Sequence, residues 1–202
     1  MSECIEKLKD FIYQEAIPVF YSYQVEKVYL NKKDRITDAE YCLAEYDNSI
    51  THATIEFLDM KLIEEKDRQK VIDEKARSSL VSISIIIAVM LTMLKEGTAI
   101  NCPFNILVII AVIYFLSAVL GAVKAIERLP YSQINVEDIV KLSGSSIEIH
   151  TSPDNDKLVS LFKYYKLNSI LNNIKGNFVD ASFKSIRNGV VILSLSIILM
   201  MF

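Results

Sequence analysis

Three long runs without a charged residue constrain this chain more than any other feature. They are Ser78 to Leu94 with 17 residues, Gly97 to Val123 with 27, and Asn188 to Phe202 with 15. A helix rises about 1.5 Å per residue, so about 20 residues cross a hydrocarbon core of ~30 Å, with a range of roughly 17–25. The second run meets this length easily and the first meets its lower limit. The third run crosses the membrane only if Arg187 extends its charge to the interface. Otherwise it lies at the membrane interface or forms a re-entrant segment.

We therefore predict a mainly α-helical integral membrane protein with three transmembrane helices rather than a water-soluble globule. Lys and Arg residues gather before the first run, after the second and before the third, whereas the loop between the first two runs has only Lys95. The positive-inside rule then places the N-terminus in the cytoplasm. The predicted organisation is a cytoplasmic helical hairpin or coiled-coil region at 1–77, a transmembrane hairpin at 78–123, a cytoplasmic linker and amphipathic helix at 124–187, and a C-terminal transmembrane helix at 188–202.

The N-terminal region is typical of helices. Pro18 ends a first short helix, and the TDAE sequence from Thr37 is a capping box that begins a second, predicted to run to about Leu94. Its apolar residues follow steps of three and four, as in a coiled coil: Leu43, Tyr46, Ile50, Ala53, Phe57 and Met60. This stripe packs either on residues 2–30 or on another copy of the chain, and both can hold.

The second half is predicted to contain a helix from Ser152 to Gly176 and a last helix from Asn177. Between them and the second run, residues 131–150 read as a short β-hairpin around Gly144 or as a brief helix.

Polar residues inside the predicted spans are few and uncharged. The pore-lining candidates are Ser84, Thr92, Asn105 and Ser117. Small residues at a four-residue spacing permit close helix packing, and here they are Ser117 with Gly121 and Ala118 with Ala122. The spans contain no Asp, Glu, Lys, Arg or His, which argues against a proton-coupled carrier or a voltage sensor and leaves a weakly selective pore or a simple anchor.

We find no constellation for catalysis. The two histidines and three cysteines form no HExxH or CxxC, and there is no GxxxxGK[ST] or GxGxxG loop. We therefore expect no enzyme activity, no metal and no cofactor. A formal net charge of −3 gives no support for binding to duplex nucleic acid. The NKKDR cluster offers Lys32, Lys33 and Arg35 to an anionic ligand or lipid headgroups, although such a turn is also often simply solvated.

The layout resembles the small transmembrane effectors of bacterial antiphage systems, namely the SLATT-type and Pycsar-type membrane effectors. The residues that carry the likeness are RSSLVSISIIIAVML at 77–91, FNILVIIAVIYFLSAVLGAVKAI at 104–126, and YYKLNSILNNIKGNFVDASFKSIRNGVVILSLSIIL at 164–199. The resemblance implies a homo-oligomer in the bacterial inner membrane that permeabilises or depolarises it in abortive infection. It also implies a partner nucleotidyltransferase or cyclase, or its nucleotide product, as the controlling signal. The alternative is a non-conducting anchor whose cytoplasmic helices recruit a soluble partner.

Overall fold

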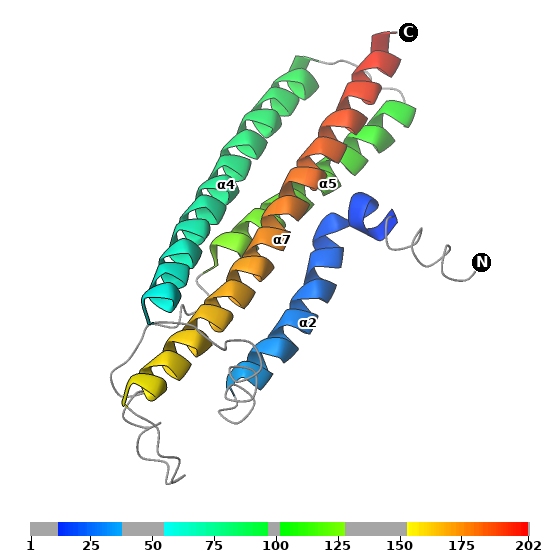
Figure 1. The fold of residues 1–202 in the computed structure, drawn as a ribbon. Coiled ribbons are helices and arrows are strands. Elements are labelled where there is room, and N and C mark those ends of the chain that lie inside the picture. The colour runs from blue at the N-terminus through cyan, green and yellow to red at the C-terminus, as the bar shows by residue number, and fades with distance from the viewer. Residues whose placement is uncertain (1–11, 38–54, 97–101, 128–152, 202) are drawn as a thin grey trace, which may run out of the picture. The chain divides into compact units, whose positions relative to one another are not determined.

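A computed structural model describes residues 12–37, 55–96, 102–127 and 153–201. Regular structure in these ranges is entirely helical. A helical turn at 12–16 precedes α2 (Pro18–Thr37), α4 (Ile55–Glu96), α5 (Cys102–Ile126) and α7 (Pro153–Met201), as Figure 1 shows. The prediction of a mainly helical chain is confirmed for this part. The predicted hairpin at 131–150 and the residues Leu43, Tyr46, Ile50 and Ala53 lie outside it.

The start of α2 follows from its proline. Pro18 has no N–H to donate and suits a helix's first position, and the chain bends at Ile17 just before it. Helix α2 continues to Thr37, so Lys32, Lys33 and Arg35 belong to a helix. The prediction that this cluster forms a turn is wrong, because no glycine or proline interrupts the helix there.

Helix α7 is one uninterrupted helix of 49 residues. It begins at Pro153, another proline at a helix start. The predicted division at Gly176 is wrong. A glycine ends a helix when the glycine itself adopts the left-handed conformation just after the last turn, but here the helix continues through Gly176.

The contacts group the chain into two units. Unit 1 comprises Met1–Val25, Ile72–Glu127 and Lys175–Phe202, and unit 2 comprises Glu26–Val71 and Arg128–Ile174. Both α4 and α7 contribute residues to each unit. The four segments predicted from the sequence are defined by charge and membrane position rather than by packing, so they stay a prediction.

In unit 2, α4 packs on α7 through a small apolar core. Its buried residues are Leu58, Leu62, Leu161, Phe162 and Tyr164. By contrast, Phe57 and Met60, which the predicted stripe includes, are 46% and 48% exposed. The buried stripe of α4 is thus offset from the predicted one, because this helix has apolar residues on both faces.

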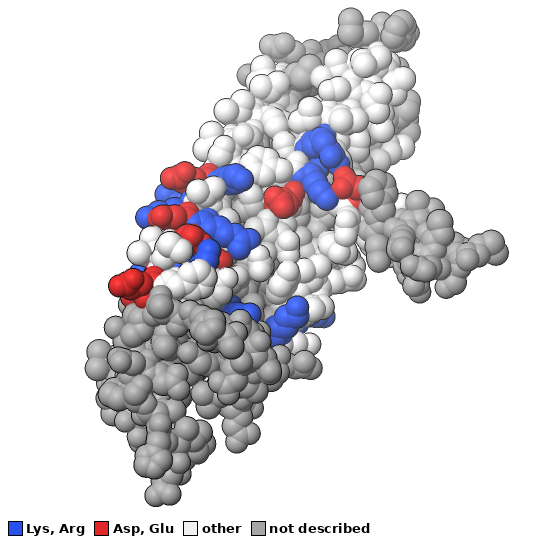
Figure 2. Space-filling view, viewed as in Figure 1, with Lys and Arg blue, Asp and Glu red and all other residues white. Residues whose placement is uncertain are grey.

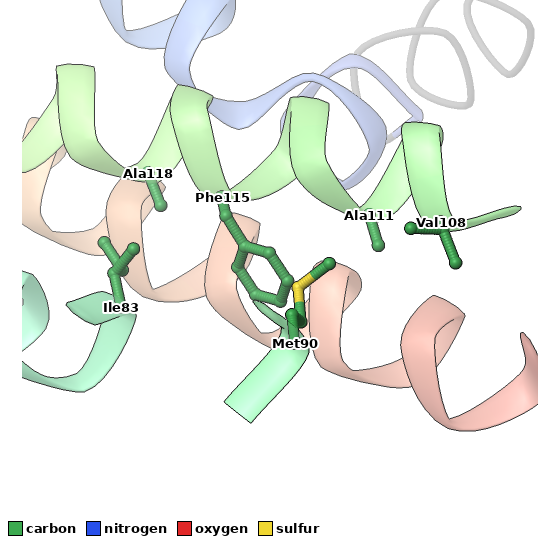
Figure 3. Close-up of a cluster of buried hydrophobic side chains, with 6 residues drawn as sticks. All are labelled: Ile83, Met90, Val108, Ala111, Phe115 and Ala118. Atoms are coloured by element: carbon green, nitrogen blue, oxygen red, sulfur yellow. The ribbon is translucent and has the colours of Figure 1, made fainter. Parts of the chain in front are cut away.

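In unit 1, α4, α5 and α7 share one core, whose central residues Figure 3 shows. Its buried residues are Ile83, Met90, Val108, Ala111, Phe115 and Ala118. Along α4 the buried positions Ile72, Ala76, Ser79 and Ile83 recur at steps of four, three and four. These steps average about 3.7 residues, close to the 3.6 residues per turn of a straight α-helix, so one stripe of α4 stays against its neighbours.

Candidate membrane-spanning surface

The three helices of unit 1 meet at a buried polar junction. Ser182 on α7 donates its hydroxyl to the backbone oxygen of Ala118 on α5 at 2.8 Å, and its Oγ lies 2.6 Å from that of Ser79 on α4. Both serines are fully buried. Since Ser182 gives its hydrogen to Ala118, Ser79 supplies the hydrogen between the two hydroxyls. The junction therefore satisfies both side chains without water, as a site surrounded by apolar residues requires.

Small residues bring α5 and α7 close together near this junction. A Cβ at Gly121 would meet the backbone oxygen of Phe178 at 3.1 Å, and a Cβ at Gly189 would meet the Phe115 ring at 2.7 Å. Ala118 and Ala122 are fully buried, and Ser117 is half-buried. The predicted packing residues Ala118, Gly121 and Ala122 thus lie in a helix interface. Gly189, which follows Ser185 at the same four-residue spacing, was missed.

The outward faces of the helices of unit 1 differ in chemistry. The outward face of α5 is aliphatic, and its large exposed residues are Ile106, Ile109, Ile110, Val112, Ile113, Leu116, Leu120 and Val123. On α4, by contrast, Ser78, Ser84 and Thr92 are exposed beside Val81, Ile85 and Leu91. The exposed surface of α5 is therefore suited to lipid alone, whereas that of α4 combines apolar and hydroxyl side chains.

The hydroxyls on α4 are satisfied within their own helix. Ser84 donates to the oxygen of Leu80 and Thr92 to that of Ala88, each at 2.9 Å. Such bonds to the preceding turn remove most of the cost of placing a hydroxyl in lipid. Of the other predicted pore residues, Ser117 lies on α5, and the side chain of Asn105 lies outside the described residues.

A charged cluster joins the N-terminal turn to α7. The Glu15 carboxylate pairs with Lys184 at 2.8 Å and with Arg187, and the Asn188 amide donates to the Glu15 backbone oxygen. Sequence reasoning missed this cluster, since 169 or more residues separate its two sides.

Two further polar pairs tie α4 to α7. In unit 2, Asn172 donates its amide to both the backbone oxygen and the carboxylate of Glu65, at 2.7 and 2.6 Å. In unit 1, the buried Lys175 lies 3.4 Å from Asp73. The signal that could have found them is the 3–4 spacing of Asn168, Asn172 and Lys175, which places them on one face of α7 with Ser182.

The structure describes only part of the predicted ligand cluster at Lys32, Lys33 and Arg35. Lys32 is exposed, with its ammonium 5.7 Å from the centre of the Tyr29 ring, a cation–π contact. The side chains of Lys33 and Arg35 lie outside the described residues. Within the residues that the structure describes, no group of three His, Cys, Asp or Glu side chains could hold a metal ion.

Three of the described helices are long and apolar enough to cross a membrane. The qualifying segments are Glu56–Thr92, Ile106–Ile126 and Ser160–Leu199. On the face that Figure 2 shows, charged side chains are confined to part of the surface, and a broad region is uncharged. These features fit a helical membrane protein with three candidate spans. Comparisons with protein-family models, curated proteins and solved structures find no match for the chain.

Proposed function

We propose that this chain is a pore-type effector of the bacterial inner membrane. It assembles into a homo-oligomer and permeabilises or depolarises the membrane in abortive infection, under the control of a partner nucleotidyltransferase or cyclase, or of its nucleotide. The N-terminus is cytoplasmic, and the chain performs no catalysis itself. The observation that supports a pore is the difference between the outward faces of α5, which is aliphatic, and α4, which carries three exposed hydroxyl residues.

The geometry suggests which helix lines the pore. In a ring of subunits α5 would face lipid, and the outward face of α4 would face the axis with Ser78, Ser84 and Thr92. Hydroxyls bonded to their own helix are tolerated in a closed, dry state, and their oxygens still accept hydrogen bonds from water in an open one. Small polar residues without charge would give weak ion selectivity.

Unit 2 offers a surface for contacts between copies. Its part of α4 exposes Phe57, Met60, Ile63 and Val71, each between 46% and 59%, among charged neighbours. Large apolar side chains in a charged helix face are suited to a partner helix. These residues support self-association through α4, which would bring several copies of its hydroxyl face together.

The second candidate is a non-conducting anchor. It is favoured by the fact that Ser84, Thr92 and Ser194 already donate to their own helix and so need no water. In this case the same exposed residues of unit 2 would recruit a soluble protein partner.

Cysteine accessibility separates the two functions. After Cys4, Cys42 and Cys102 are replaced by serine, we expect Ser84→Cys and Thr92→Cys in liposomes to react with a charged thiol reagent and the reaction to reduce ion flux. The matched controls Leu116→Cys and Leu120→Cys, on the aliphatic face of α5, are expected to stay unreacted.

Equal protection of all four cysteines would contradict the pore, as would the absence of ion flux from liposomes that contain the unmodified oligomer with its partner enzyme and nucleotide. Either result would leave the anchor as the function of this chain.

A further inference from the structure

The N-terminal segment from Ile12 to Tyr23 is held along α5 and α7 of unit 1 by several independent contacts. Tyr114 on α5 donates its hydroxyl to the backbone oxygen of Ala16 at 2.9 Å. Ser22 shares its hydroxyl hydrogen between the backbone oxygens of Pro18 in its own helix and Asn177 on α7, each at 3.1 Å. Tyr23 packs its ring edge-on against that of Phe178 at 5.0 Å. Together with the ion pairs of Glu15, these contacts fix the segment in place on the two helices.

The contact at Tyr114 shows how far along α5 the segment extends. Tyr114 stands ten residues from Lys124, the nearest charge on α5, which is about 15 Å of helix. It is twelve residues from Cys102, or about 18 Å. A hydrocarbon core of ~30 Å takes about 20 residues, so it cannot fit on α5 between Cys102 and Tyr114 alone. The bilayer must extend past Tyr114 towards Lys124, and so past Ala16.

The charges on α7 lie at the same depth. Lys184 and Arg187 stand between Ser182 and Gly189, which pack on α5 as described above. That part of α5 belongs to its uncharged run. Two unpaired cations there would be costly in hydrocarbon. Glu15 contacts both, so the cluster carries a net charge of +1 rather than +2.

The side chains that the segment turns away from the helices are apolar. Ile12, Ile17 and Phe20 are 53%, 49% and 53% exposed, whereas Val19 is buried against Gly121. From Ala16 to Val25 the sequence has no charge. The segment from Ile12 to Val25 also has three tyrosines, Tyr13, Tyr21 and Tyr23, a residue type that gathers at membrane interfaces.

We propose that residues 12–25 are embedded in the leaflet on the side of Arg77 and Lys124, with Ile12, Ile17 and Phe20 in contact with lipid acyl chains. Glu15 acts there as the counter-charge that holds Lys184 and Arg187 within the bilayer. The first part of the expected cytoplasmic region is thus a fourth membrane element that does not cross. This inference requires membrane insertion but does not depend on a pore.

The sequence contains no tryptophan, so a single Phe20→Trp substitution gives a unique fluorophore. In liposomes of phosphatidylglycerol and phosphatidylethanolamine with brominated acyl chains, we expect its emission to be quenched as strongly as that of Leu116→Trp on the lipid face of α5. Phe57→Trp, in the charged part of α4, is the matched control and should show little quenching. Ile12→Trp repeats the test at a second position if the first variant loses its helical circular dichroism.

The proposal would be overturned if Phe20→Trp and Ile12→Trp were quenched no more strongly than Phe57→Trp. Weak quenching of Leu116→Trp as well would show that the chain is not inserted and would overturn it too. A lack of ion flux with strong quenching would contradict only the pore.

The role of Glu15 is tested in the Phe20→Trp background. Glu15→Gln should reduce the lipid quenching of the fluorophore, because the segment loses its ion pairs with α7, and Glu15→Asp should restore part of it. Unchanged quenching in Glu15→Gln would show that the segment needs no counter-charge and would overturn this part of the proposal.

Discussion

Replacing Asn172 by leucine should destabilise unit 2 by about 2 to 4 kcal/mol, because it leaves the buried Glu65 carboxylate without its amide donor. Glu65 is 7% exposed and receives both the side-chain and the backbone hydrogen bond from Asn172. Arg68, at 3.6 Å from the same carboxylate, compensates only in part, since it is nearly half exposed. Chemical denaturation in detergent micelles, followed by circular dichroism, measures the loss.

For the double variant Glu65→Leu with Asn172→Leu we expect no such loss of stability. It removes the buried charge and the amide oxygen of Asn172, which has no hydrogen-bond partner. Well-packed apolar residues in place of a buried polar pair are often neutral or stabilising. We expect the free energy of unfolding to return at least to that of the native chain. A sum of two independent losses in the double variant would contradict this account.

The neighbouring Asn173 supplies the matched control. It accepts a hydrogen bond from Arg68 on the exposed side of α7. Because solvent replaces such a bond readily, Asn173→Leu should cost less than about 1 kcal/mol. An equal loss at both positions would show that asparagine is needed in α7 for a reason other than the buried pair.

The second large effect is expected at Gly189. A Cβ there would lie 2.7 to 3.1 Å from three atoms of the Phe115 ring, which is 1% exposed and packed in the core of unit 1. Gly189→Val should therefore lower the free energy of unfolding by about 2 to 3 kcal/mol through overpacking, in spite of its better helix propensity. The same denaturation measurement checks it.

Gly176 on the same helix is the control, since a Cβ there would meet only Ile72 at 4.0 Å. Gly176→Ala should stabilise the chain by up to about 1 kcal/mol, because alanine favours a helix more than glycine does. A Phe115→Leu substitution should recover part of the loss in Gly189→Val, as expected for residues in contact. Equal stability of Gly189→Val and the native chain would contradict the tight approach of α5 and α7.

The helices themselves were largely predictable. Uncharged runs of sufficient length can satisfy their backbone in lipid only as helices, so the three candidate spans follow from composition alone. The inward face of α4 was harder to predict. Leu58 and Leu62 are buried while Phe57 and Met60 are exposed, yet both pairs are apolar, so hydrophobicity did not distinguish the face that packs from the face that does not.

The polar contacts between helices could not be predicted for a different reason. Which residues pair with Glu15 depends on which helices pack together, and the residues near Glu15 in the sequence do not determine that packing. Asn172 and Ser182 looked like ordinary polar residues of an amphipathic helix. Their burial follows only once the apolar stripe of α4 is placed against the same face of α7.

The unbroken course of α7 also fixes its helical phase. Each residue turns the helix by about 100°, so a deletion of one residue between Ser182 and Gly189 would rotate one of these two contacts away from α5 while the other kept its place. A deletion of a heptad turns the side chains by only about 20° but moves them by about 10 Å along the axis. The fit of α7 to α5 thus depends on both the rotation and the height of each residue, so insertions and deletions of any length in this stretch would be poorly tolerated.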